Sequence, residues 1–148
     1  MTLANRVVVI TGASGRLGSV LTRDLAALGA NLALLERNPA KLASLVEDLA
    51  LPQERVLTHA VDLLDAGAGR EAAGAVVVRF GRVDILLHLV GGWTGGKLLV
   101  DTPAADLEAM LNQHVWTSFN VLQAFVPHLV RNGWGRIVMI TTPAASRP

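Results

Sequence analysis

The segment TGASGRLG, Thr11–Gly18, decides the fold of this chain. It follows the apolar run RVVVI, Arg6–Ile10, and precedes a stretch in which leucines recur at positions 17, 21, 25 and 28. A β-branched run that stops at a glycine is typical of a buried strand, and leucines at this spacing form one face of a helix, which Gly29 would end. The segment is therefore predicted to be the turn between a first strand and a first helix.

The rest of the chain repeats this alternation of apolar runs and helical patterns. The predicted strands are Arg6–Ile10, Ala30–Leu35, Arg55–Val61, Val83–Val90 and Arg136–Ile140. The predicted helices are Leu17–Leu28, one that Asn38 and Pro39 begin, Asp65–Phe80, and a long one from the Thr102–Pro103 cap to Arg131 that Pro127 should kink or end. This order predicts an α/β fold with one doubly wound parallel sheet of five strands and helices on both faces. We expect one domain, residues 1–148.

Composition excludes several classes of protein. The chain has 148 residues, of which 51% are hydrophobic and 17% charged, so it can bury a core. The net charge is +1 without a block of like charges, which argues against a nucleic-acid partner or a membrane surface. There is no cysteine, no apolar run of the roughly 18 residues that a membrane span needs, and no metal-ligand spacing among the four histidines. We expect a cytoplasmic protein without a bound metal.

The glycines of the first turn predict a phosphate-binding site. Gly12 permits a tight exit from the strand, Gly15 removes a side chain where phosphates would lie, and Gly18 allows close packing of the helix. Main-chain N–H groups at the start of a helix attract an anion, and Arg16 adds positive charge there. Ser14 and Leu17 complete the expected site. A purely structural turn is the alternative, whereas a P-loop is excluded because no Gly-Lys-Ser/Thr follows.

A charged pair after the second strand bears on the choice of dinucleotide. Glu36 lies 18 residues beyond Gly18, close to the spacing at which an acid bonds the adenosine ribose 2′-hydroxyl. Its carboxylate would repel a 2′-phosphate, whereas Arg37 or Arg16 could pair with one. The balance slightly favours NAD over NADP.

From these motifs the chain resembles the short-chain dehydrogenase/reductase family along its whole length, which implies a Rossmann-like fold. The segment Val61–Asp65 is similar to the family's segment after strand three, so Asp62 would meet the adenine amine, with Leu63 beside it. Gly81–Gly92 resembles strand four and its Asn-Asn-Ala-Gly end, with both asparagines replaced. Val90, Gly91 and Gly92 would then approach the cofactor. The glycine spacing departs from that of ordinary reductases, whose middle glycine lies at the Arg16 position.

The resemblance also implies catalytic positions. Met110–Leu129 is similar to the family's long interface helix, with His114 where an asparagine usually holds a relay water. Gly135–Thr142 resembles strand five, with Thr142 at the place of the catalytic serine. Thr142 can also be an ordinary residue at a strand end, and His114 an ordinary packed histidine; His88 is expected to be structural.

The family's Tyr-x-x-x-Lys pair has no counterpart here, since the chain contains no tyrosine. We therefore expect the N-terminal part of an oxidoreductase that, when complete, transfers hydride between nicotinamide and a small carbonyl or alcohol substrate. A non-catalytic, redox-sensing module that binds NAD(P) is the alternative. The open fifth strand predicts a homo-oligomer.

Overall fold

The computed structural model describes residues 2–141 and contains one parallel sheet of five strands. The order across the sheet is β3-β2-β1-β4-β5, and every neighbouring pair is parallel. The strands are β1 Val7–Thr11, β2 Asn31–Glu36, β3 Val56–Ala60, β4 Ile85–His88 and β5 Arg136–Met139. The predicted doubly wound sheet is confirmed, although β4 is shorter than the apolar run that predicted it. The order reverses between β1 and β4, and the carboxyl ends of these strands are where such sheets bind ligands.

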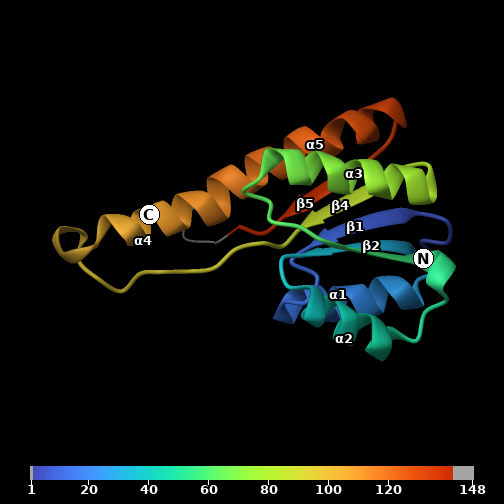
Figure 1. Ribbon diagram of the computed structural model, residues 1–148, viewed down its shortest axis with the longest axis horizontal. Coiled ribbons are helices and arrows are strands. Elements are labelled where there is room, and N and C mark those ends of the chain that lie inside the picture. Colours follow the sequence, from blue (N-terminus) through green and yellow to red (C-terminus); the bar gives the residue numbers. More distant parts are fainter. Residues whose placement is uncertain (1, 142–148) are drawn as a thin grey trace.

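Helices cover both faces of the sheet (Figure 1). Helices α1 (Arg16–Ala27) and α2 (Pro39–Leu49) lie on one face, and α3 (Ala66–Phe80) and α5 (Thr117–Arg131) lie on the other. Helix α4 (Ala104–Leu111) extends away from the sheet, after a long connection from β4. The short helices η1 (Gln53–Arg55) and η2 (Leu99–Asp101) lie in connections.

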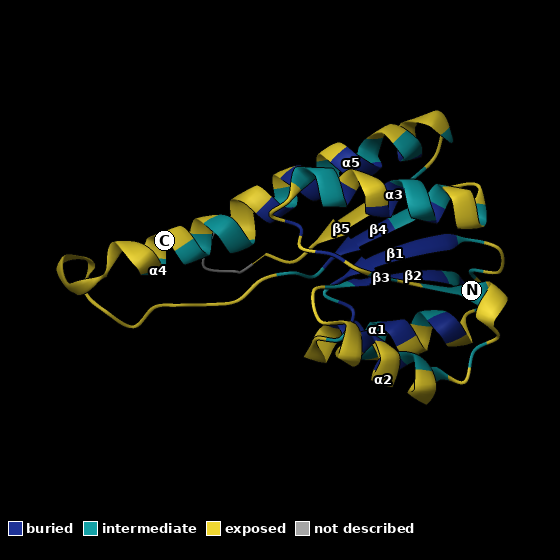
Figure 2. Cartoon of the chain, viewed as in Figure 1, coloured by how far each residue is buried: buried dark blue, intermediate teal, exposed yellow. Residues whose placement is uncertain are grey.

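The core follows from the alternation of side chains along the strands. Val7 and Val9 of β1 pack toward α3 and α5, whereas Val8 and Ile10 pack toward α1 and α2. All four are essentially inaccessible to solvent, as expected for a central strand covered on both faces. Strands β1, β2 and β4 are the most deeply buried, while every residue of β5 is exposed (Figure 2).

Helix α1 lies closer to the glycine-rich turn than the leucine pattern predicted. Its fully buried residues are Gly18, Thr22 and Ala26. Of the four predicted leucines, Leu21 and Leu25 pack partly buried against the core, whereas Leu17 and Leu28 are exposed. A Cβ atom on Gly18 would collide with the carbonyl oxygen of Gly12 and lie 2.7 Å from that of Ala13. Gly18 therefore allows the start of α1 to lie against the turn, which leaves no room for a side chain at this position.

Helix α3 forms in spite of its three glycines. The Asp65 carboxylate accepts hydrogen bonds from the main-chain N–H groups of Gly67 and Ala68, which caps the first turn. Gly81, with φ of +76°, ends the helix as predicted. Gly69 is buried, and a Cβ atom there would lie 4.0 Å from the Cβ of Ala124 in α5. Small residues thus bring α3 and α5 together, so packing offsets the low helix propensity.

The predicted long helix contains an irregularity. A π-helical segment, η3 (Asn112–Trp116), joins α4 to α5. The prediction that Thr102 caps this helix was wrong, because its hydroxyl donates to the Leu98 carbonyl and α4 begins after Pro103. Pro127 does not end the helix, which continues to Arg131. Pro127 and Gln123, whose carbonyl loses its partner, are both exposed, so water can satisfy that carbonyl.

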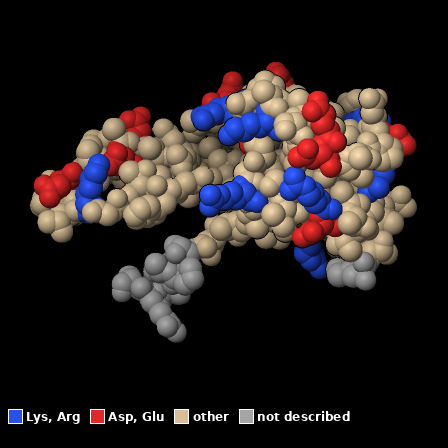
Figure 3. Space-filling model, turned by 90° about the horizontal axis from the view of Figure 1, so that it is seen from below, with Lys and Arg blue, Asp and Glu red and all other residues tan. Residues whose placement is uncertain are grey.

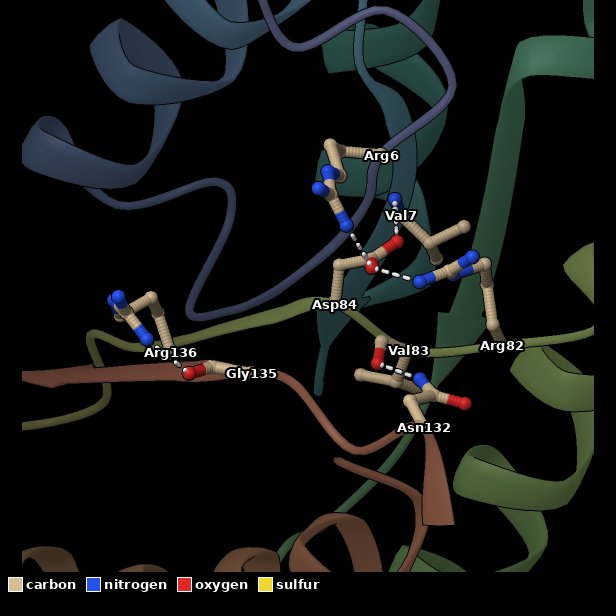
Figure 4. Close-up of polar contacts among 8 residues, drawn as sticks. All are labelled: Arg6, Val7, Arg82, Val83, Asp84, Asn132, Gly135 and Arg136. Carbon is tan, nitrogen blue, oxygen red and sulfur yellow. Dashed lines mark hydrogen bonds and ion pairs between the residues drawn. The ribbon is translucent and has the colours of Figure 1, made fainter. Parts of the chain in front are cut away.

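A buried carboxylate ties together the amino ends of β1 and β4 (Figure 4). Asp84 accepts hydrogen bonds from the Val7 N–H and from the guanidinium groups of Arg6 and Arg82. Burial alone raises the pKa of Asp84, but these three donors together hold it below its ordinary value. The Arg6 and Arg136 guanidiniums also lie over the Trp134 ring, at 4.3 and 5.1 Å from its centroid, which links this cluster to β5.

Candidate functional site

The turn between β1 and α1 leaves several main-chain donors free. Among residues 2–141, the N–H groups of Ser14, Arg16, Leu17 and Gly18 have no hydrogen-bond acceptor. Gly15 occupies the N-cap position and offers no side chain, and the first turn of α1 carries no acidic residue. Free N–H groups and the positive end of a helix dipole are the features with which helix starts attract anions.

Helices α2 and α3, which begin within six residues of the ends of β2 and β3, provide an internal comparison. The Asn38 side chain accepts from the N–H groups of Ala40 and Lys41 at the start of α2. Asp65 caps α3 in the same way. Helix α1 alone among these three has no capping side chain. Helix α4 also has no capping side chain, but it begins away from the sheet. The uncapped start of α1 lies at the carboxyl edge of the sheet, where its donors are open to a ligand.

The glycines fix the shape of the turn. Gly12 has φ of +69°, which L side chains rarely adopt, and a Cβ atom there would lie 3.2 to 3.3 Å from the main chain of Leu89 and Val90. The end of β4 thus lies directly against the turn. These contacts agree with the predicted roles of Gly12 and Gly18, with the difference that Gly18 adjoins the turn rather than the sheet.

An open cavity of about 310 Å³ lies beside this turn, at the carboxyl edge of the sheet. Nine of the predicted cofactor residues line it: Gly12, Ser14, Gly15, Glu36, Arg37, Asp62, Leu63, Val90 and Gly91. Four others do not line it: Arg16, Leu17, Gly18 and Gly92. The sequence analysis missed eight lining residues: Leu35, Lys41, Val61, Leu64, Leu89, Asn112, Gln113 and Thr117. Most of these residues are next to a predicted site residue in the sequence. Their position after the strands, at the carboxyl edge of the sheet, could therefore have indicated them.

Glu36 is held in one orientation by three donors. Its Oε2 accepts from the Ser14 hydroxyl at 2.7 Å, and its Oε1 accepts from the N–H groups of Arg37 and Asn38 at 2.9 and 3.4 Å. The first of these bonds joins the glycine-rich turn to the end of β2, across the cavity wall. Lys41, from the first turn of α2, lines the same cavity and adds a positive charge to it.

The loop after β4 is fastened to the π-helical segment. The Nε2–H of His114 donates to the Gly92 carbonyl at 2.8 Å. A Cβ atom on Gly91 would lie 3.1 Å from His114 Cε1, so only glycine fits easily against this ring. The His114 ring is therefore a loop anchor, and its predicted role in proton relay stays a prediction.

His88 is buried at the end of β4. It lies beside its register partner Thr11, with Nδ1 and the Thr11 hydroxyl 2.8 Å apart. Burial, together with the nearby His114, lowers the pKa of His88 to about 4. Its Nε2 is buried and has no hydrogen-bond partner among the described residues. This environment is that of a neutral histidine, in keeping with the structural role expected for it.

Thr142, the predicted catalytic hydroxyl, lies outside the described residues.

Within residues 2–141, no three His, Asp or Glu side chains converge as metal ligands would. The same part of the chain contains no helix that is both long and apolar enough to cross a bilayer. On the face drawn in Figure 3, Lys and Arg side chains are interspersed with Asp and Glu.

A parallel sheet with a glycine-rich turn and a cavity at its switch point defines a Rossmann-like domain, the class that binds dinucleotides. A sequence profile described as short chain dehydrogenase matches residues 6–148. The chain belongs to the short-chain dehydrogenase family.

Individual relatives agree with this assignment. The chain is 30% identical over 139 residues to 2,3-dihydroxy-2,3-dihydro-p-cumate dehydrogenase of Pseudomonas putida, covering 93% of this chain and 53% of that protein. An NAD+-bound xylitol dehydrogenase has a TM-score of 0.88 and 26% identity over 99% of this chain and 56% of its own. A metagenomic short-chain oxidoreductase in complex with NADP has a TM-score of 0.86 and 30% identity over 100% of this chain and 67% of its own. The chain thus spans about half the length of the curated relatives that it matches.

Proposed function

We propose that this chain binds NAD(H) or NADP(H) in the cavity beside the first turn, and serves an oxidoreductase that interconverts a carbonyl and an alcohol. The uncapped start of α1, next to a cavity at the switch point of the sheet, is the observation that carries the proposal. The chemistry of the turn also supports the proposal. A pyrophosphate needs several hydrogen-bond donors, and the N–H groups of Ser14, Arg16, Leu17 and Gly18 are free to supply them.

Each wall of the cavity is assigned a part of the dinucleotide. The free N–H groups of the turn bind the pyrophosphate, and Arg16 adds charge at the mouth. Glu36 accepts hydrogen bonds from the adenosine ribose, because its orientation is already fixed by Ser14 and by the main chain. Asp62 and Leu63 bound the adenine. Val90, Gly91 and Gly92 lie beside the nicotinamide half.

The coenzyme preference follows from the charges around Glu36. Three donors hold the Glu36 carboxyl group in place, and its negative charge opposes a 2′-phosphate. Arg37 and Lys41 line the same cavity and offset part of that repulsion. We therefore propose NAD as the preferred coenzyme, with NADP bound less tightly.

The nicotinamide, when bound, supplies the hydride acceptor or donor. The chain's own contribution is to hold that ring at the end of β4, where Gly91 and Gly92 allow a close approach. We propose that Thr142 donates a hydrogen bond to the substrate oxygen and that His114, whose Nε2–H is engaged by Gly92, relays a proton through Nδ1. The 148 residues contain no tyrosine to act as the family's proton donor, so binding is a sharper test than turnover.

An apolar surface outside the cavity supports the proposed homo-oligomer. Leu107, Leu111, Val115 and Phe119 recur every four residues along α4, η3 and α5, and each is more than two-fifths exposed. Figure 2 shows that this projecting helix and β5 are largely uncovered. A second copy of the chain would bury such a stripe. A compact monomer at all concentrations in sedimentation would contradict the proposal.

Calorimetric titration of the chain with NADH, NADPH and ADP-ribose tests the proposed dinucleotide binding. We expect saturable binding of all three, with NADH tighter than NADPH. ADP-ribose should bind because it retains the pyrophosphate and adenosine that the turn, Glu36 and Asp62 are proposed to contact. Absence of binding of every one of them at millimolar concentration would refute the proposed function.

A further inference from the structure

A buried amide on α5 fixes the loop that forms the adenine side of the cavity. Asn120 is 7% exposed, and its Nδ2 donates to the carbonyl oxygens of Leu63 and Leu64 at 2.9 and 3.0 Å. Both amide hydrogens are thereby used. The contact joins segments more than fifty residues apart in the sequence, so it fixes the position of the loop relative to the helix layer.

The same loop is held at only a few other points. The Val61 N–H donates to the Glu36 carbonyl, which continues the pairing of β3 with β2. Within the loop, Asp62 accepts from the N–H groups of Leu64 and Asp65, and these bonds fix its turn but not its position. The Leu63 side chain belongs to the core between the sheet and α3 and α5. At the other end of the loop, the Asp65 carboxylate caps α3. Asn120 is thus the polar contact that holds Leu63 and Leu64, between these two ends, against α5.

Loss of this amide would leave two carbonyl oxygens without donors. The contact to the Leu63 carbonyl is buried, and a buried carbonyl without a partner is costly, so the loop would move toward solvent to reach water. Asp62, Leu63 and Leu64 all line the cavity, and such a movement would change the wall that they form.

We propose that Asn120 is a positioning residue for the adenine-binding wall: it acts on the dinucleotide through the loop Val61–Asp65 without touching it. The inference rests on the proposed function, since it assigns that wall to adenine. It adds a residue that no motif in the sequence indicates.

Asn132 provides a matched control. It is also an asparagine of the α5 region whose Nδ2 donates to a loop carbonyl, that of Val83. Its partner precedes β4, at the amino edge of the sheet (Figure 4), and neither Asn132 nor Val83 lines the cavity. Removal of either amide should cost similar stability, but only Asn120 should affect the cofactor wall.

The test compares Asn120→Ala and Asn132→Ala in two measurements. Hydrogen exchange without nucleotide should show faster exchange of the Leu64 and Asp65 amides in Asn120→Ala only. Calorimetry with ADP-ribose should show affinity about 5- to 30-fold weaker in Asn120→Ala and nearly unchanged in Asn132→Ala. If Asn120→Ala does not fold, Asn120→Ser retains one donor and should lose less affinity.

Several outcomes would overturn the inference. Wild-type affinity in Asn120→Ala, or an equal loss in Asn132→Ala, would show that Asn120 contributes only to general stability. Failure of the unaltered chain to bind ADP-ribose would instead refute the proposed function. If the unaltered chain binds ADP-ribose and the Asn120 variants bind it with the same affinity, only the positioning role of Asn120 is refuted.

Discussion

Gly18→Ala is the substitution that most directly disturbs the turn. The added Cβ atom would overlap the Gly12 carbonyl oxygen and lie 2.7 Å from that of Ala13. Both obstacles are main-chain atoms, so the turn and the start of α1 must separate. Overpacking of this kind costs about 1–3 kcal/mol or more, against which the better helix propensity of alanine recovers about 1 kcal/mol. We expect a net loss of about 1–2 kcal/mol in the free energy of unfolding.

The same substitution should weaken nucleotide binding, because it moves the free N–H groups of Arg16 and Leu17. We expect the Kd for ADP-ribose to rise about tenfold or more, consistent with the loss of one charge-assisted hydrogen bond. Urea unfolding and calorimetry measure the two effects. Gly74→Ala is the control: it lies within α3, nothing is within 4 Å of its added Cβ, and it should be stabilising without an effect on affinity. Unchanged affinity in folded Gly18→Ala would refute the reasoning.

Three further predictions concern single side chains. Asp84→Ala removes the acceptor of the Val7 N–H and of two guanidiniums, so the free energy of unfolding should fall by about 3 kcal/mol in urea titration; an effect below about 1 kcal/mol would contradict a structural role. Because burial lowers the pKa of His88 from 6.5 to about 4, the unfolded chain takes up the proton first as the pH falls, and stability is lost between these two values. His88→Asn should therefore reduce the loss of stability between about pH 7.5 and about pH 4.5 by about 2–3 kcal/mol, whereas an unchanged pH profile would count against the buried neutral state. Glu36→Ser should raise the affinity for NADPH relative to NADH by about tenfold in calorimetry, and an unchanged ratio would remove Glu36 from coenzyme selection.

Much of the fold could be predicted because its signals are local. Strand periodicity, the glycine turn and the Asn38 cap each depend on a few neighbouring residues, and the structure retains them. The exposed Leu17 and Leu28 show the limit of such patterns. Their spacing indicates a helix correctly, but the closeness of α1 to the turn decides which face is buried.

The features that escaped prediction depend on distant segments. Thr102 looked like a helix cap, yet its hydroxyl is used by the preceding short helix. The π-helical segment η3 has no periodicity of its own. Lys41 and Thr117 line the cavity only because α2 and α5 are brought to its edge by the sheet order. Asn120 likewise acts on a loop that precedes it by more than fifty residues, so no local pattern could reveal its contact.

The central claim is that free amides at the start of α1 bind the pyrophosphate, and NMR of the ¹⁵N-labelled chain tests it most directly. Addition of ADP-ribose should shift the amide signals of Ser14, Arg16, Leu17 and Gly18. The capped amides Gly67 and Ala68 should shift much less, since their hydrogens are already bonded and neither residue lines the cavity. Saturable binding that leaves the four turn amides unshifted would contradict the account.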